Sequence, residues 1–137
     1  MIIDLHTHTQ EYSSCSHLPM EELIHRAMAV GLDGVAVTDH SRIGGAEGAL
    51  DWCPELQWLS AMEVFNGHCD DGESSQARRL ARTLGLPGVG GSDAHFAPEV
   101  GIAATLFPDP ISTDEELIAA LRAGYCSPRR WIADSWK

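Results

Sequence analysis

Two short histidine motifs carry the side chains of this sequence that are best suited to chemistry. His6 and His8 are separated by one residue, and Asp93 and His95 have the same spacing in the second half of the chain. In an extended backbone, side chains two positions apart point to the same side, so each pair can present two groups to one cavity. Imidazoles and carboxylates are ligands that zinc, iron and manganese accept. The spacing therefore indicates a site for divalent metals.

Further polar side chains belong to other apolar runs. Asp39 and His40 directly follow the run 34–38, and Glu63 lies within the run 62–65. A single Asp-His or His-x-His motif is a weak signal, because such residues also serve as ordinary caps and turns. Several of them at the ends of predicted strands indicate one shared site, since the carboxyl ends of parallel strands meet on one face of a sheet.

The other histidines have simpler interpretations. His25 falls inside a predicted helix and is interpreted as a surface or core residue. His17 and His68 lie in predicted loops, where each could be a ligand or have no role in the site, and we favour the second interpretation. A nucleophilic mechanism has little support, because the sequence contains no Gly-x-Ser-x-Gly elbow.

Charge and lysine content exclude several classes of function. The chain has 20 acidic and 9 basic residues and a formal net charge of −11, which disfavours binding to nucleic acid or to anionic lipid. Its single lysine is Lys137 at the end, so a P-loop lysine, a Schiff-base lysine or a carboxylated-lysine metal bridge has no carrier in the body of the domain.

The apolar pattern predicts one α/β domain over residues 1–137. Apolar runs of strand length occur at 2–5, 34–38, 62–65, 88–91 and 101–107. Helical periodicity, with caps and glycine stops, occurs at 19–30, 73–84 and 113–123. This alternation is typical of a parallel sheet with crossover helices. The segment 41–60 has no assigned element.

The cysteines and the start of the chain favour a cytoplasmic protein with reduced thiols. None of the four cysteines forms a Cys-x-x-Cys pair, and the apolar start is interrupted at once by Asp4, unlike a signal peptide. No apolar run approaches the ~20 residues of a membrane span. We therefore expect no membrane partner.

Four segments of the sequence resemble the PHP (polymerase and histidinol phosphatase) domain family: IIDLHTHTQEYSSCS, GLDGVAVTDH, MEVFNG and GLPGVGGSDAH. The resemblance implies a distorted (β/α)7-type barrel, divalent metals at the strand ends and hydrolysis of phosphate esters. Family members carry further strands and histidines where this chain has only 41–60. We therefore expect a shortened PHP-like barrel with missing strands that binds one to three zinc, manganese or iron ions.

The resemblance also implies roles for individual residues. His6 and His8 resemble the first ligand pair, with Asp93 joining them on one metal. His40 and His95 resemble the ligands of a further metal. His40 and Asp93 are the candidate catalytic residues.

Two further ligands are open alternatives. Cys15 falls where the family has an aspartate, a histidine or sometimes a cysteine, and its thiolate could complete the site of His40 and His95. Glu63 matches a segment whose glutamate is not the usual bridging ligand, but its side chain could turn inward and substitute.

These observations predict a metal-dependent phosphoesterase that hydrolyses a small phosphate ester by means of metal-activated hydroxide. Two alternatives remain. One is a degenerate PHP-like metal-binding domain with a regulatory or structural role, and the other is a hydrolase of C–N bonds without a carboxylated lysine. The sequence leaves the oligomeric state open. A homo-oligomer is one alternative, because a barrel short of strands leaves an edge that another subunit could cover.

Overall fold

The computed structural model describes residues 1–38, 60–132 and 135–137. The predicted site residues Asp39 and His40 lie outside this part of the chain. Its strands are β1 (Ile2–Thr7), β2 (Gly34–Val37), β3 (Met62–Asn66), β4 (Gly88–Gly91), β5 (Ala103–Leu106), β6 (Ser127–Ile132) and β7 (Ser135–Trp136). Its helices are α1 (Met20–Ala29), α3 (Asp71–Leu84) and α4 (Asp114–Ala123), with a 3-10 turn η3 (Ala97–Glu99).

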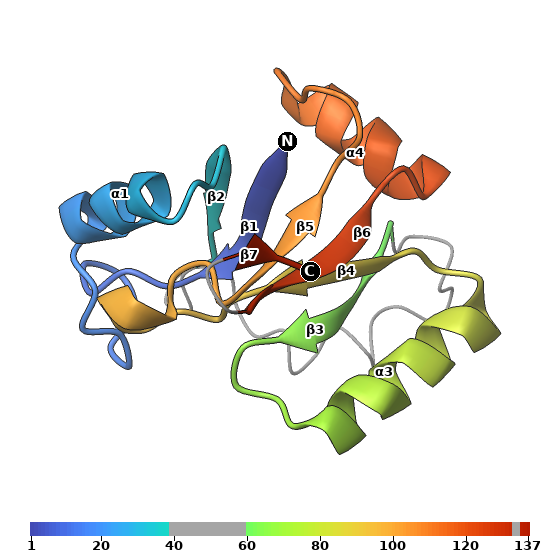
Figure 1. The fold of residues 1–137 in the computed structure, drawn as a ribbon, viewed down its shortest axis with the longest axis horizontal. Coiled ribbons are helices and arrows are strands. Elements are labelled where there is room, and N and C mark those ends of the chain that lie inside the picture. Colours follow the sequence, from blue (N-terminus) through green and yellow to red (C-terminus); the bar gives the residue numbers. More distant parts are fainter. Residues whose placement is uncertain (39–59, 133–134) are drawn as a thin grey trace.

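The strands form two sheets, which Figure 1 shows side by side. The larger sheet has the order β2-β1-β5-β6-β7, and the smaller one pairs β3 with β4. Only β1 with β2 and β3 with β4 are parallel among these pairs, whereas β5 runs antiparallel to β1 and to β6. The α/β class is confirmed, but the prediction of a parallel sheet is wrong for β5. Helix α4 connects β5 and β6, which are antiparallel. A strand–helix–strand pattern in the sequence does not show whether the two strands are parallel or antiparallel.

The predicted barrel is not confirmed. In the described residues the two sheets do not close on themselves, and β2 and β7 form the ends of the larger sheet. The sequence pattern also did not predict β6, which contains Pro128 and two arginines, or β7, which has only two residues.

Strand β4 meets β1 where both strands end, which brings the two histidine motifs together (Figure 1). The backbone N–H of Asp93 donates to the carbonyl oxygen of His6 at 2.7 Å, and that of His8 donates to Ala94 at 3.0 Å. Gly91 allows this approach, because a Cβ at this position would overlap His6 and come within 2.7 Å of Glu63 Oε1. The chain therefore needs glycine at the end of β4.

A fully buried carboxylate, that of Asp4, ties three segments of the chain to one another. Its Oδ1 accepts the backbone N–H of Ser92 at 2.8 Å and that of His6 at 3.2 Å. Its Oδ2 accepts the N–H of Gly101 at 3.2 Å. Burial raises the pKa of this carboxyl group, while the hydrogen bonds act in the opposite direction. Asp4 thus connects β1 with the segments that follow β4 and η3.

The helices begin and end where local chemistry requires it. Asp70 and Glu73 form a reciprocal capping box, so α3 begins at Asp71, two residues before its predicted start. Thr113 caps α4 by accepting the N–H of Glu116, and Gly124 ends that helix in the left-handed region. No helix in the described residues is both long and apolar enough to cross a lipid bilayer.

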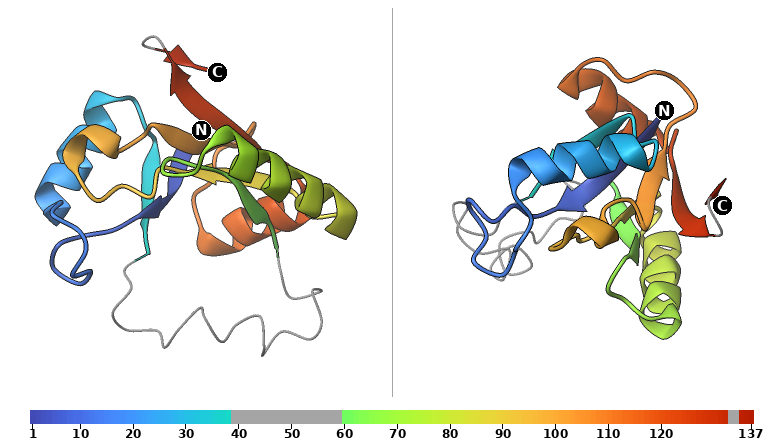
Figure 2. Two further views of the ribbon diagram at one scale, coloured as in Figure 1. Left: turned by 90° about the horizontal axis from the view of Figure 1, so that it is seen from below. Right: turned by 60° about the vertical axis from the view of Figure 1, so that its left-hand side comes forward.

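Helices α1 and α3 lie at opposite ends of the molecule (Figure 2). Helix α1 buries Leu23 and Ala27 in a cluster that also contains Leu18, Val100 and Ala104. Helix α3 packs against β3. The apolar cluster of α1 therefore lies beside η3, and α3 covers β3.

The carboxylate of Asp4 makes a testable contribution to stability. Asp4→Asn places an NH₂ group against backbone N–H donors, and we expect a loss of about 1–3 kcal/mol of unfolding free energy, because a buried donor is left without an acceptor. Urea unfolding of the chelator-treated protein measures this loss. Asp33→Asn is the control, since Asp33 accepts an exposed bond from Ile2 at 2.7 Å. Equal losses in the two variants would contradict the anchoring role.

Candidate metal centre

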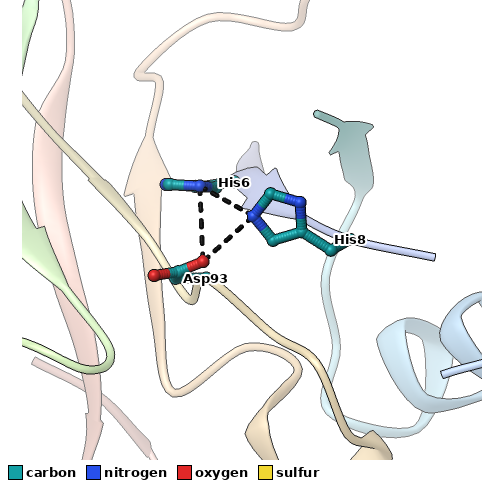
Figure 3. Close-up of side chains that lie close together, drawn as sticks. All are labelled: His6, His8 and Asp93. Atoms are coloured by element: carbon teal, nitrogen blue, oxygen red, sulfur yellow. Dashed lines mark hydrogen bonds and ion pairs between the residues drawn. The ribbon is translucent and has the colours of Figure 1, made fainter. Parts of the chain in front are cut away.

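Three ligand atoms converge at the ends of β1 and β4 (Figure 3). Nε2 of His6 lies 3.0 Å from Nε2 of His8, and the latter lies 3.0 Å from Oδ1 of Asp93. Nε2 of His6 lies 3.4 Å from the same oxygen. The structure thus brings together the three residues that the resemblance to the PHP family assigned to one metal, although they lie far apart in the sequence.

The donor set and its spacing fit a divalent cation. Ligand atoms about 2.0–2.1 Å from a tetrahedral ion are about 3.3 Å from one another, close to the spacing found here. Two Nε2 atoms that face each other at 3.0 Å cannot both carry a proton comfortably. A cation between them and the carboxylate would satisfy both imidazole lone pairs and the negative charge at once.

Glu63 contacts His6 through the other ring nitrogen. Its Oε1 lies 3.1 Å from Nδ1 of His6, and its Oε2 accepts a bond of 2.9 Å from the Asn66 amide. A carboxylate in this place keeps the proton on Nδ1 and directs the Nε2 lone pair toward a metal. Glu63 was predicted as a possible ligand, but its carboxylate lies on the side of His6 away from the three converging atoms.

The same carboxylate changes the acidity of His6. The hydrogen bond with Glu63 is the largest cause that raises the pKa of His6, and burial of the ring acts in the opposite direction. The charges of Glu63, Asp93 and Asp4 add to the increase. Without a metal, His6 therefore holds a proton more readily than an exposed histidine does.

Asp93 has an unusual backbone conformation, with φ at 56°. Aspartate adopts the left-handed region more readily than most residues with a side chain. The conformation directs the carbonyl oxygen of Asp93 to Nδ1 of His95, at 2.7 Å, while its side chain faces His8. Asn66 also donates to Oδ2 of Asp93 at 3.3 Å.

A second group of candidate ligands lies next to the first. It consists of His68, His95 and Glu99, of which the sequence predicted only His95. His68 had been interpreted as having no role, and Glu99 had not been considered. A useful signal was available in the sequence, because Glu99 follows His95 by four residues across a proline-containing turn.

Two predicted ligands remain, Cys15 and His40. Cys15 is exposed in the segment after β1 and belongs to neither group. Its role as a ligand therefore stays a prediction. His40, which was to share a metal with His95 and to act in catalysis, lies outside the described residues.

The comparisons with known proteins concern the second half of the chain. A family model described as PHP-associated matches residues 73–126, a segment that includes Asp93 and His95. This match supports a relationship to the PHP family. The match confirms the resemblance to the PHP family, while His6 and His8 lie outside the matched residues. No curated protein and no solved structure matches the chain.

Asp93→Asn tests the first group without disturbing its backbone, because asparagine also tolerates a positive φ. We expect the affinity of this site for zinc or manganese to fall by at least ~10–100-fold. That is the loss typical when a residue that only orients a metal ligand is removed, and Asp93 is itself a candidate ligand. Isothermal titration of the chelator-treated protein measures the change. His25→Gln, at an exposed position of α1, is the control. An unchanged affinity in Asp93→Asn would contradict the assignment.

Glu63→Gln tests the orienting role of the carboxylate. In the metal-free protein, the raised pKa of His6 makes a contribution to stability that is fully present below about pH 6.5 and is lost as pH rises through the folded-state value. The variant removes the charge of Glu63 and so weakens the largest cause of the raised pKa of His6. We therefore expect the pKa of His6 to fall and the stability to depend less on pH. NMR titration of the His6 ring measures the pKa directly. An unchanged value would show that Glu63 does not act on His6.

Proposed function

We propose that this protein is a metal-dependent phosphoesterase that hydrolyses a small phosphate ester. The observation that carries the proposal is the convergence of His6, His8 and Asp93 within 3.4 Å of one another at the end of β1. The relationship to the PHP family supports the same class of reaction.

The residues of the site have distinct tasks in this reaction. A divalent ion held by the three residues would supply hydroxide at neutral pH, because coordination lowers the pKa of water from about 15.7 to about 7. His8 is 1% exposed and anchors the inner side of the site. Glu63 orients His6, and Asn66 holds both Glu63 and Asp93 in place through its amide. With a net charge of −11, the protein would depend on the cation to attract an anionic substrate.

A domain that binds metal without turnover is the second candidate. The specific observation in its favour is the open arrangement of the two sheets in the described residues, in place of a closed barrel. Such a protein would keep the ligands but have a regulatory or structural role.

A phosphatase assay with the full chain decides between these candidates. We expect hydrolysis of para-nitrophenyl phosphate in the presence of manganese or zinc, followed by activity on natural phosphomonoesters. Chelation should abolish the activity, and Asp93→Asn should reduce it by at least ~10-fold. An amide substrate tested in parallel measures the hydrolysis of C–N bonds, and its cleavage would support the alternative of a C–N hydrolase. Bound metal without phosphate release would favour the domain without turnover.

A further inference from the structure

We propose that two copies of this chain pair through helices α3 and α4, so that the arginine-bearing face of α3 in one copy contacts the acidic start of α4 in the other. The inference goes beyond the proposed function, because it assigns a partner to a surface outside the candidate metal ligands. Its test depends neither on metal binding nor on turnover.

Helix α4 carries apolar residues that the described part of the chain leaves uncovered. None of its ten residues is buried there, and Ile118 is 43% exposed. An isolated helix shorter than about 12–15 residues is marginal in water, and most helical stability comes from packing of an apolar face. Leu117 and Leu121 are half-buried and supply part of this packing. The side of α4 around Ile118 is open to a further partner.

That side of α4 is acidic. Asp114 and Glu115 belong to the first turn of the helix and are exposed. They precede Ile118 by four and three positions, so the three side chains lie on the same side of the helix. In the residues that the structure describes, neither carboxylate forms an ion pair. Helix α4 therefore presents two carboxylates beside an exposed isoleucine.

Helix α3 offers the opposite charge. Residues 74–92 contain no aspartate or glutamate but three arginines of α3, Arg78, Arg79 and Arg82. Arg78 stacks on the ring of Phe65. Arg79 and Arg82 form no ion pair within the described ranges of the chain. No acidic side chain lies one helical turn from either of these two arginines, so both are available to carboxylates of another molecule.

The two arginines border a hollow on α3. The hollow has a volume of about 540 Å³ and is lined by Gln76, Arg79, Leu80, Arg82 and Thr83. Leu80 is 47% exposed. An exposed leucine beside arginines matches an exposed isoleucine beside carboxylates, because apolar contact and opposite charges then coincide in one interface.

The positions of the two helices permit a closed dimer. Helices α3 and α4 lie on either side of β6 (Figures 1 and 2), and every copy carries both faces. A two-fold axis between the helices produces two identical contacts, α3 with the partner's α4 and α4 with the partner's α3. A second copy therefore covers both faces at once.

A solvated surface makes a different prediction. If Arg79 and Arg82 interact only with water, the protein is a monomer at every salt concentration. Changes of charge on α3 and α4 then have no effect on its mass in solution.

Sedimentation equilibrium of the full chain distinguishes these interpretations. We expect a dimer whose dissociation constant rises at least ~10-fold between low salt and about 1 M salt, because the Debye length falls to about 3 Å. Arg79→Glu combined with Arg82→Glu should weaken the dimer by at least ~10-fold, since like charges then face each other. Asp114→Arg combined with Glu115→Arg should weaken it for the same reason.

A mixture of the two charge-reversed chains provides the decisive comparison. Each chain alone places like charges in both contacts, whereas a mixed pair restores opposite charges in both. We therefore expect the mixture to dimerise at least ~10-fold more tightly than either variant alone. A variant that fails to fold would not be rescued in this way.

Glu21→Arg combined with Glu22→Arg is the matched control. It makes the same change of charge in the first turn of α1, which lies at the opposite end of the molecule from α3 (Figure 2), and should leave dimerisation unchanged. The proposal is overturned if the unchanged chain is a monomer at its highest soluble concentration, or if the mixture dimerises no better than its components. Neither result bears on the proposed phosphoesterase, which the metal-binding and turnover assays test.

Discussion

The buried carboxylate of Asp4 is the constraint on which the rest of the centre depends. A charged group removed from water is costly unless backbone donors surround it, and here the donors are the N–H groups of His6, Ser92 and Gly101. Each donor lies beside a segment that carries candidate ligands. Asp4 and His6 belong to β1 and His8 directly follows this strand, so the anchor and two of the candidate ligands lie in one short segment of the chain.

The centre is organised from the inside outward. His8 lies at the closed end, His6 and Asp93 are partly covered, and the side chain of His68 is exposed. Asn66 connects these levels, because it contacts Glu63, Asp93 and the backbone of His68. A small amide at the end of β3 therefore coordinates the positions of carboxylates that would otherwise repel one another.

The sequence was sufficient to predict most of the strands and helices but not their assembly. Apolar runs and caps located β1, β2 and α1 within a few residues, because these signals are local. The direction of β5 was missed, since it depends on which neighbour the strand finds in space. Strand β6 was missed because Pro128 and two arginines conceal its pattern.

The candidate site was predictable where the ligands follow one another in the chain. His6 with His8 and Asp93 with His95 are pairs that spacing alone reveals. Glu63 was recognised, but which nitrogen of His6 it faces depends on the pairing of β3 with β4. His68 and Glu99 can be recognised as candidate ligands only once the turn after β3 lies next to η3. No short sequence pattern predicts that these two segments are neighbours.

Gly91 shows that a centre of this kind can depend on volume as much as on charge. A methyl group there would overlap His6 and crowd Glu63, although every imidazole and carboxylate of the chain would still be present. A related sequence that keeps the histidines and aspartates but has a larger residue in place of Gly91 would look like a metal-binding protein. Its β1 and β4 could not approach each other as they do here. A glycine at position 91 is therefore as important a marker of an assembled centre as the polar residues around it.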